Sequence, residues 1–176
     1  MNSGWVKGAA ALAMIAALAA CNRAPEVNAA DAEANLQAGQ TFLAQNAKAE
    51  GVRTLPGGIQ YKVVQSGPAG GESPDGNDLV RVDYEGSLID GSVFDSSYER
   101  GAPAVFTLGT VVEGWTEVLQ HMKPGDEWIV YLPADKGYGE RSSPEIPANS
   151  VLVFRLKLLD ISRAPGGGPI GRTANG

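Results

Sequence analysis

Apolar and polar residues alternate over most of the chain after residue 58, a pattern that predicts half-buried β-strands. Val80, Val82 and Tyr84 fall on one side of such a segment, with charged residues between them. Residues 151–161 repeat the alternation, and Asp90-Gly91 is a strong signal for a tight hairpin. Further strands are predicted at residues 59–63, 93–95, 104–108 and 128–132. The pattern therefore predicts an antiparallel sheet of five to six strands.

One short segment inside this strand-rich region has helical spacing instead. Leu119 and Met122 follow Trp115 by four and seven residues, which places them on one side of a helix that Pro124-Gly125 ends. One helix cannot cover a flat sheet of this size, so the sheet should curl around it. The predicted fold class is α+β: a curved antiparallel half β-barrel of five to six strands wrapped around one short α-helix, with an N-terminal helical extension.

The helical extension is predicted over residues 31–51. Asp31 can cap its start, and Gly51 lies just past its end, where helices favour glycine. The apolar stripe of this segment is weak, and Gly39 in its middle lowers helix stability by about 1 kcal/mol relative to alanine. The composition favours a spacer over a part of the core.

The first 20 residues have the features of an export signal. Lys7 precedes a run of apolar residues, 9–20, that is too short to span a bilayer and suits the core of a signal peptide. The run ends in Leu18-Ala19-Ala20-Cys21, which closely resembles the lipobox of bacterial lipoproteins. In a lipobox the cysteine receives a diacylglyceryl group and becomes the new N-terminus. A secretory signal followed by a chance cysteine is the alternative.

These features divide the chain into regions. We expect a signal peptide at 1–20, a lipid anchor at Cys21 within a tether at 21–30, and a main domain at 52–163. Residues 164–176 are rich in Gly and Pro and are predicted to be disordered. By analogy with bacterial lipoproteins, the absence of Asp after Cys21 favours the outer membrane, with the protein facing the periplasm.

Composition excludes several classes of function. The formal net charge is −6, which argues against nucleic acid and anionic lipid as direct ligands. The chain has one Cys and one His, so neither a disulfide nor a cluster of such metal ligands is expected within it. We expect no metal and no cofactor.

Aromatic and aliphatic residues gather where the predicted strands and the short helix end, with a single carboxylate among them. Taken alone, Trp115 is better explained as a core residue. As a set they predict a site with much apolar surface and few polar groups, suited to an uncharged ligand or to a reaction that needs no nucleophile. The set comprises Tyr84, Phe94, Asp95, Val111, Val112, Trp115, Tyr138, Ile146 and Phe154.

Six short motifs occur in an order and near-spacing that resemble the FKBP-type peptidyl-prolyl cis/trans isomerases. The resemblance covers about residues 59–160. Together with the N-terminal helix and the lipobox, it is closest to the exported bacterial members of the macrophage infectivity potentiator group. The motifs are Tyr84-Glu85-Gly86, Gly91, Phe94-Asp95-Ser96-Ser97, Val111-Val112-Glu113-Gly114-Trp115, Gly137-Tyr138-Gly139 and Leu152-Val153-Phe154.

The resemblance implies a role for each residue of the set. Tyr84, Phe94, Asp95 and Tyr138 would be catalytic, with Arg100 paired to the Asp95 carboxylate. The substrate-binding residues would be Trp115 as the floor, Val111, Val112 and Phe154 as walls, and Ile146 on the rim. Ala104 departs from the pattern, because eukaryotic members usually carry an aromatic residue at this position.

The function implied is isomerisation of X–Pro bonds in exported proteins, assisting folding in the cell envelope. Its partners would be proline-containing polypeptides and macrolide inhibitors. Two alternatives stay open: an envelope chaperone or binding module in which turnover is secondary, and a purely structural half-barrel.

Overall fold

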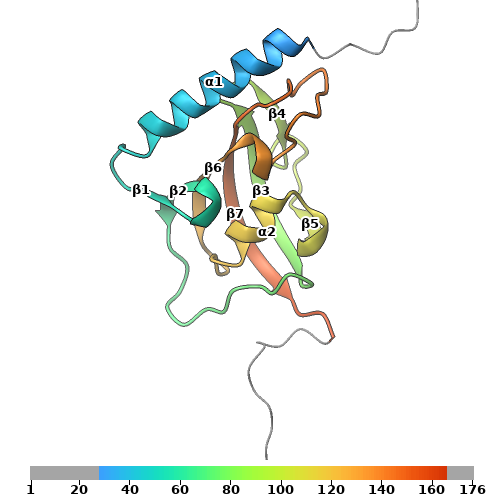
Figure 1. Cartoon of the computed structure of the whole chain (residues 1–176). Helices are drawn as coiled ribbons and strands as arrows, with labels where there is room; N and C mark the ends of the chain where they lie inside the picture. The colour runs from blue at the N-terminus through green and yellow to red at the C-terminus, as the bar shows by residue number, and fades with distance from the viewer. Residues whose placement is uncertain (1–27, 166–176) are drawn as a thin grey trace, which may run out of the picture.

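Strand β3 (Leu79–Leu88) is central to the sheet of the computed structural model, which describes residues 28–165. It pairs with β4 (Val93–Ser96), β5 (Ala104–Thr107) and β7 (Leu152–Ser162), and all pairings in the sheet are antiparallel. The remaining strands are β1 (Val52–Thr54), β2 (Gln60–Gln65) and β6 (Glu127–Leu132). Their order is β1-β2-β6-β7-β3-β4, with β5 beside β3 (Figure 1).

The sheet has seven strands, one more than the five to six predicted. The additional strand is β1, whose three residues pair with β2 from Val52↔Lys62 to Thr54↔Gln60. A segment of three residues is too short for an alternating pattern to be detected. The other six strands lie where the alternation predicts them, so the predicted fold class is confirmed.

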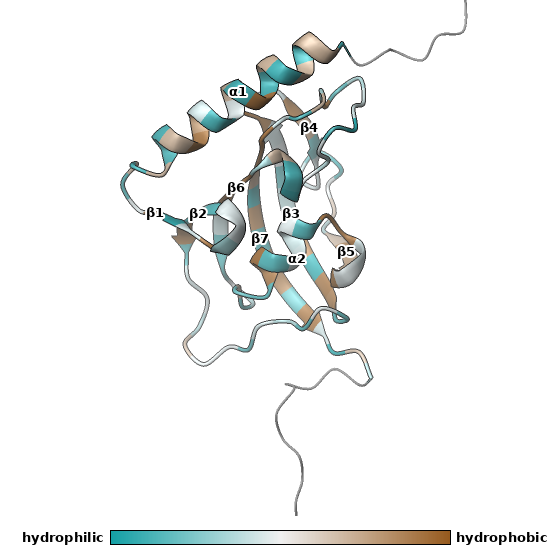
Figure 2. Ribbon diagram, in the orientation of Figure 1, coloured by the Kyte–Doolittle hydropathy of each residue, from teal (hydrophilic) through white to brown (hydrophobic). Residues whose placement is uncertain are grey.

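The short helix α2 (Glu113–Leu119) fills the inner side of the curved sheet. Its residues Trp115, Val118 and Leu119 are buried, as are Leu152, Phe154, Leu156 and Leu158 on β7. Hydrophobic and hydrophilic positions alternate along the strands in Figure 2, as expected for a sheet with one buried side. Three 3-10 turns, η1 (Pro56–Gly58), η2 (Leu108–Thr110) and η3 (Ala134–Lys136), connect the elements.

The N-terminal helix α1 spans Ala29–Asn46, so both of its predicted ends need correction. Asn28 is the cap, because its side chain accepts a hydrogen bond of 3.1 Å from the Ala30 N–H, and Asp31 lies in the first turn. Residues 47–51 form turns that lead directly into β1, with Gly51 at φ 79° in the last of them. The helix therefore ends one turn before the glycine predicted to follow it.

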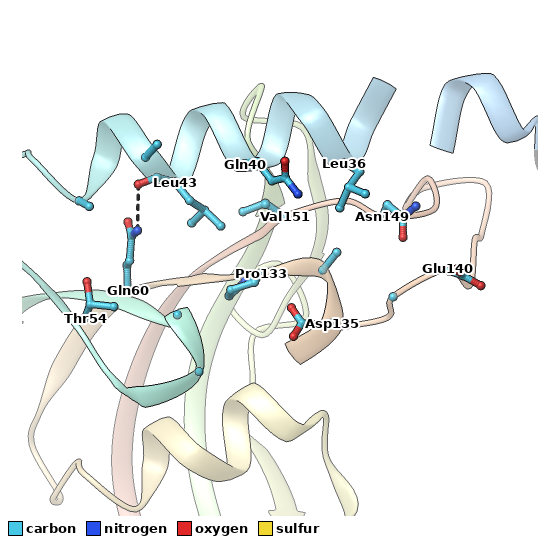
Figure 3. Close-up of a pocket in the computed structure, with 16 residues that line it drawn as sticks. Leu36, Gln40, Leu43, Thr54, Gln60, Pro133, Asp135, Glu140, Asn149 and Val151 are labelled. Atoms are coloured by element: carbon cyan, nitrogen blue, oxygen red, sulfur yellow. Dashed lines mark hydrogen bonds between the residues drawn. The ribbon is translucent and has the colours of Figure 1, made fainter. Parts of the chain in front are cut away.

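Helix α1 packs against the main domain and does not behave as a spacer (Figure 1). Gly39 is its buried residue, and a Cβ atom there would lie 2.7 Å from Cγ2 of Val151. Gln60 alternates with the apolar residues Ile59 and Tyr61 along β2, yet it is only 5% exposed, because α1 covers it. Its Nε2 donates a hydrogen bond of 2.9 Å to the Leu43 carbonyl (Figure 3). Its Oε1 accepts a hydrogen bond from Asn46 Nδ2.

The predicted signal peptide, the Cys21 anchor, the tether up to residue 27 and the tail beyond residue 165 lie outside the described residues. Within residues 28–165, neither helix is long and apolar enough to cross a membrane.

Candidate functional site

A cavity of about 520 Å³ lies where the inner side of the sheet meets α2. Eight of the nine residues predicted for the site line it, and they come from β3, β4, β7, α2 and the loops between. Ile146 lines a neighbouring cavity of about 210 Å³, which shares Tyr138 and Arg141 with the first. The larger cavity is lined by Tyr84, Phe94, Asp95, Phe106, Thr110, Val111, Val112, Trp115, Tyr138, Arg141 and Phe154.

Trp115 is the floor of this cavity and is only 4% exposed. The rings of Tyr84, Phe106 and Phe154 stand edge-on to its indole, with centroids 5.1, 5.7 and 5.2 Å away and interplanar angles between 82° and 86°. Edge-to-face contacts of this kind are favourable and fix the orientation of each ring. The floor is thus a rigid aromatic surface to which an apolar ring can bind.

Gly86 on β3 makes room for two of the wall residues. A Cβ atom at this position would lie 2.6 Å from Cζ of Phe94 and 2.7 Å from Cε1 of Phe154. Gly86 pairs with Phe154 on β7 and with Asp95 on β4, so the missing side chain leaves a gap in the middle of the sheet. The two phenyl rings fill that gap at 5.7 Å and 88°.

The polar side of the cavity is a group of three hydrogen-bonded side chains. The Tyr84 hydroxyl donates to Asp95 Oδ2, and Arg100 Nη1 donates to Asp95 Oδ1. Arg100 Nη2 also donates to the Tyr84 hydroxyl oxygen at 2.9 Å, and its guanidinium lies 5.3 Å from the centroid of the Tyr84 ring. Both oxygens of the carboxylate are therefore engaged, and the predicted pairing of Arg100 with Asp95 is observed.

The backbone around this group is fixed by Ser97, which is completely buried. Its hydroxyl accepts a hydrogen bond of 2.9 Å from the Tyr84 N–H, and its own N–H donates to the Tyr84 carbonyl, also at 2.9 Å. The serine hydroxyl donates in turn to Asp83 Oδ1 at 3.1 Å. These bonds attach the end of β4 to β3 and keep Asp95 beside Tyr84.

Burial raises the pKa of the Tyr84 phenol above its usual value of 10, and the hydrogen bond to Asp95 raises it further. The hydrogen bonds that the Arg100 guanidinium donates to Tyr84 and Asp95 raise its pKa above the usual value. At neutral pH the phenol therefore remains an O–H donor and the guanidinium remains charged.

Tyr138 stands at the mouth of the cavity and is 40% exposed. It belongs to residues 137–150 between η3 and β7, which we call the rim loop and which also carries Ile146. The Arg141 guanidinium lies 5.6 Å from the centroid of the Tyr138 ring, and its Nε donates to the Tyr138 carbonyl at 3.2 Å. The Tyr138 side chain is thus available to a ligand that enters from solvent.

Within the described part of the chain, no group of three or more His, Cys, Asp or Glu side chains could hold a metal ion. The side chains that line the cavity supply aromatic faces, two phenol hydroxyls, the Thr110 hydroxyl, the Arg141 guanidinium and the Asp95 carboxylate, which is paired with Arg100. They suit the binding of an apolar ring next to a polar, uncharged group.

Sequence reasoning missed Phe106, Thr110 and Arg141 as lining residues and gave no role to Gly86. Phe106 could have been found, because it lies two residues after Ala104 and so shares its side of β5. Ala104 and Phe106 are half-buried, whereas the alternate residues on the strand are exposed. Phe106 therefore supplies an aromatic wall on the same side of the strand as the small residue at 104.

Two family models match the chain. The model described as FKBP-type peptidyl-prolyl cis-trans isomerase matches residues 70–159, and that of the domain amino terminal to it matches residues 6–63. Peptidyl-prolyl cis-trans isomerase Mip from Coxiella burnetii is 47% identical over 130 residues, covering 73% of this chain and 56% of the relative. Outer membrane protein MIP from Legionella longbeachae is 43% identical over 134 residues, covering 76% and 57%.

Among solved structures, the crystal structure of FkpA from Escherichia coli matches with a TM-score of 0.74 at 43% identity. The match covers 78% of this chain and 63% of that chain. The chain spans about half the length of the curated relatives that it matches.

Proposed function

The chain belongs to the family of FKBP-type peptidyl-prolyl cis-trans isomerases, and we propose that it catalyses cis/trans isomerisation of X–Pro bonds in exported polypeptides. The observation that carries the proposal is the aromatic cavity over Trp115 with the Tyr84–Asp95–Arg100 group at its side. The cavity offers an apolar surface and neutral hydrogen-bond donors beside a fully engaged carboxylate. An apolar surface with neutral hydrogen-bond donors can assist rotation about a peptide bond, a reaction that requires no nucleophile.

Proline is the residue that fits this cavity. Its ring is apolar and can lie against the Trp115 indole, between the edge-on rings of Tyr84 and Phe154. Its nitrogen carries no hydrogen, so burial leaves no backbone donor without a partner. Any other residue would bring an N–H into an apolar site, which is unfavourable.

The apolar environment favours the rotated state of the bond. Resonance gives the peptide bond a barrier of about 18–20 kcal/mol and makes the planar amide strongly polar. The twisted transition state has lost that resonance, so its transfer from water into the cavity is less unfavourable than that of the planar amide. To accelerate this rotation by about 10⁵, the cavity must lower its activation free energy by about 7 kcal/mol.

Each polar group has a place in this mechanism. The Tyr138 hydroxyl donates a hydrogen bond to the substrate carbonyl at the mouth of the cavity. Asp95 orients the Tyr84 phenol and acts through its negative charge, because both of its oxygens already accept hydrogen bonds. No proton is transferred in the rotation step.

The test is a protease-coupled assay with tetrapeptides that contain one X–Pro bond. Added chain should speed cis-to-trans conversion well above the uncatalysed rate, and Phe94→Ala should lower kcat/KM by about tenfold or more because it removes a wall. Absence of acceleration by the wild-type chain would refute the proposal. Binding of proline peptides without acceleration would instead support a binding module or chaperone.

We propose further that the protein is a lipoprotein of the outer membrane that faces the periplasm. Two observations support this localisation: the Leu18-Ala19-Ala20-Cys21 sequence, and a relative named Outer membrane protein MIP. Macrolides that bind family members are proposed as inhibitors, since the same aromatic cavity would accept their apolar rings.

A further inference from the structure

Two side-chain amides connect α1 to the end of the rim loop. One lies on the helix and donates to the loop, and the other lies on the loop and donates to the helix. Asn35 Nδ2 on the helix donates to the Ala148 carbonyl on the loop at 3.1 Å. Asn149 Nδ2 on the loop donates to the Ala32 carbonyl on the helix at 3.2 Å. The donors and acceptors are separated by 113 and 117 residues in the sequence, so these contacts exist only when α1 lies against the domain.

Asn149 also closes the rim loop at its base. Its N–H donates to the Gly139 carbonyl at 2.7 Å, and Gly139 directly follows Tyr138. Asn149 has φ 59° and is the single non-glycine residue with positive φ in the described part of the chain. Asparagine tolerates this left-handed conformation better than most residues. Asn149 therefore joins α1, the base of the rim loop and the segment that carries Tyr138.

Among the described residues, the two amides are the hydrogen bonds that attach the first half of α1 to the main domain. A cavity of about 740 Å³ lies beneath the helix, lined by Leu36 and Leu43 from above and by Pro133 and Val151 from below (Figure 3). The apolar packing of α1 is thus incomplete. The second half of the helix is attached by Gln60 and by the ring of Phe42, which lies 5.9 Å from that of Tyr131 on β6. The Gly39–Val151 contact holds its middle, and the two asparagines hold its start.

We infer that Asn35 and Asn149 are positioning residues of the isomerase site, through which α1 fixes the rim loop with Tyr138 and Ile146 over the cavity. The inference rests on the proposed function. If the loop is released, only a fraction of molecules present Tyr138 correctly, and the apparent affinity for substrate falls by that fraction. Molecules that do bind substrate keep the same floor and walls. The expected signature is a higher KM with kcat nearly unchanged.

The experiment uses the full chain with Asn35→Ala and Asn149→Gly, alone and combined. Glycine at 149 keeps the positive φ accessible and removes the amide, but it also makes the backbone of the loop more flexible. Asn35→Ala leaves the sequence of the rim loop unchanged, so it separates the lost hydrogen bond from that added flexibility. Gln37→Ala on the exposed side of α1 is the matched control, since its side chain bonds only to Glu33 on the same helix among the described residues. KM and kcat are measured with X–Pro peptides, and hydrogen exchange is followed for peptides that cover residues 138–150.

Each lost hydrogen bond should raise KM about 2- to 10-fold, with kcat within about twofold of wild type. Exchange in the rim loop should become faster in the same variants, and Gln37→Ala should change neither. Unchanged exchange, or faster exchange with unchanged KM, would overturn the inference. A wild-type chain without isomerase activity would refute the proposed function, while exchange would still report whether α1 fixes the loop.

Discussion

The Tyr84 hydroxyl and the Asp95 carboxylate are joined across two neighbouring strands, and Arg100 bonds to both. Asp95 lies opposite Gly86 in the β3–β4 register, and Tyr84 is two residues from Gly86 on the same side of β3. The pair is partly open to solvent, since 42% of the Asp95 side chain is exposed. An ion pair with this exposure adds little stability, so its main effect is to orient the phenol.

The first prediction concerns pH. The pKa of Tyr84 is raised, so the phenol stays protonated up to and beyond its usual value of 10. We expect kcat/KM to be flat from about pH 6 to 9, because no group titrates in the rotation step. The stability that the buried, neutral phenol contributes is present below pH 10 and is lost as the pH rises through the folded-state pKa. A pH–rate profile together with alkaline unfolding checks both statements.

Asp95→Asn is the informative variant for the same experiment. It preserves the shape of the side chain and an acceptor for Tyr84 but removes the negative charge, so activity should fall only in part. Its profile should be as flat as that of the wild type. A steep pH dependence that disappears in Asp95→Asn would show that Asp95 works as a titrating catalyst, in contradiction to the mechanism proposed.

The second prediction is that Gly86→Ala damages the cavity although it replaces none of the residues that line it. The new Cβ would lie within 2.7 Å of both Phe94 and Phe154, so the two rings must move. We expect kcat/KM to fall by about tenfold or more and the free energy of unfolding to fall by about 1–3 kcal/mol. Gly76→Ala is the control, because nothing lies within 4 Å of a Cβ there. Equal activity of the two variants would contradict the assignment of Phe94 and Phe154.

The third prediction is that Gly39→Ala destabilises the protein, although alanine in a helix is usually more favourable than glycine. Gly39→Ala raises helix propensity by about 1 kcal/mol but places a Cβ 2.7 Å from Val151 Cγ2. Overpacking outweighs the gain, so urea unfolding should show the variant to be less stable than the wild type.

Val151→Ala changes the sign of this effect. Without Cγ2, the nearest remaining Val151 side-chain atom is Cβ at 3.7 Å, an ordinary contact. Gly39→Ala added to Val151→Ala should therefore increase stability, which gives a non-additive double-mutant cycle. Stabilisation by Gly39→Ala in both backgrounds would mean that α1 does not pack closely at this point.

The fourth prediction tests the proposed anchor. Cys21→Ser removes the site of lipid attachment, so the protein should move from the membrane fraction to the soluble periplasmic fraction. Fractionation followed by a high-salt wash distinguishes lipid anchoring from ionic adsorption. A variant that remains in washed membranes would refute the lipoprotein proposal, and isomerase activity measured in parallel shows that it is folded.

The alternation of apolar and polar residues predicts most of this fold, because a sheet with one buried side imposes a period of two residues. Gln60 breaks the rule, since a helix from elsewhere in the sequence covers a position that the strand pattern places outside. No local signal reports such a tertiary contact. The C-terminal end of α1 lies earlier than predicted, because the chain turns into β1 before the glycine that usually terminates a helix.

The aromatic set of the site was predictable as a group of residue types but not as a geometry. The edge-on contact of Phe154 with Trp115 depends on Gly86, because a side chain at position 86 would occupy the space of the Phe154 ring. The connection of α1 to the rim loop joins residues more than 100 positions apart in the sequence. Neither has a periodicity or a spacing that sequence analysis could detect.

The position of β7 has a consequence for when the protein can fold. The last strand in the sequence lies inside the sheet, between β6 and β3, and pairs with both along most of its length. Until the residues of β7 are available, no strand pairs the half of the sheet that ends in β6 with the half that begins at β3. Pairing between strands that are far apart in the sequence is also slow. If the chain is exported as proposed, a nascent chain still crossing the membrane lacks β7, the strand that joins the two halves of the sheet. We therefore expect the sheet to be completed only after residue 162 has emerged.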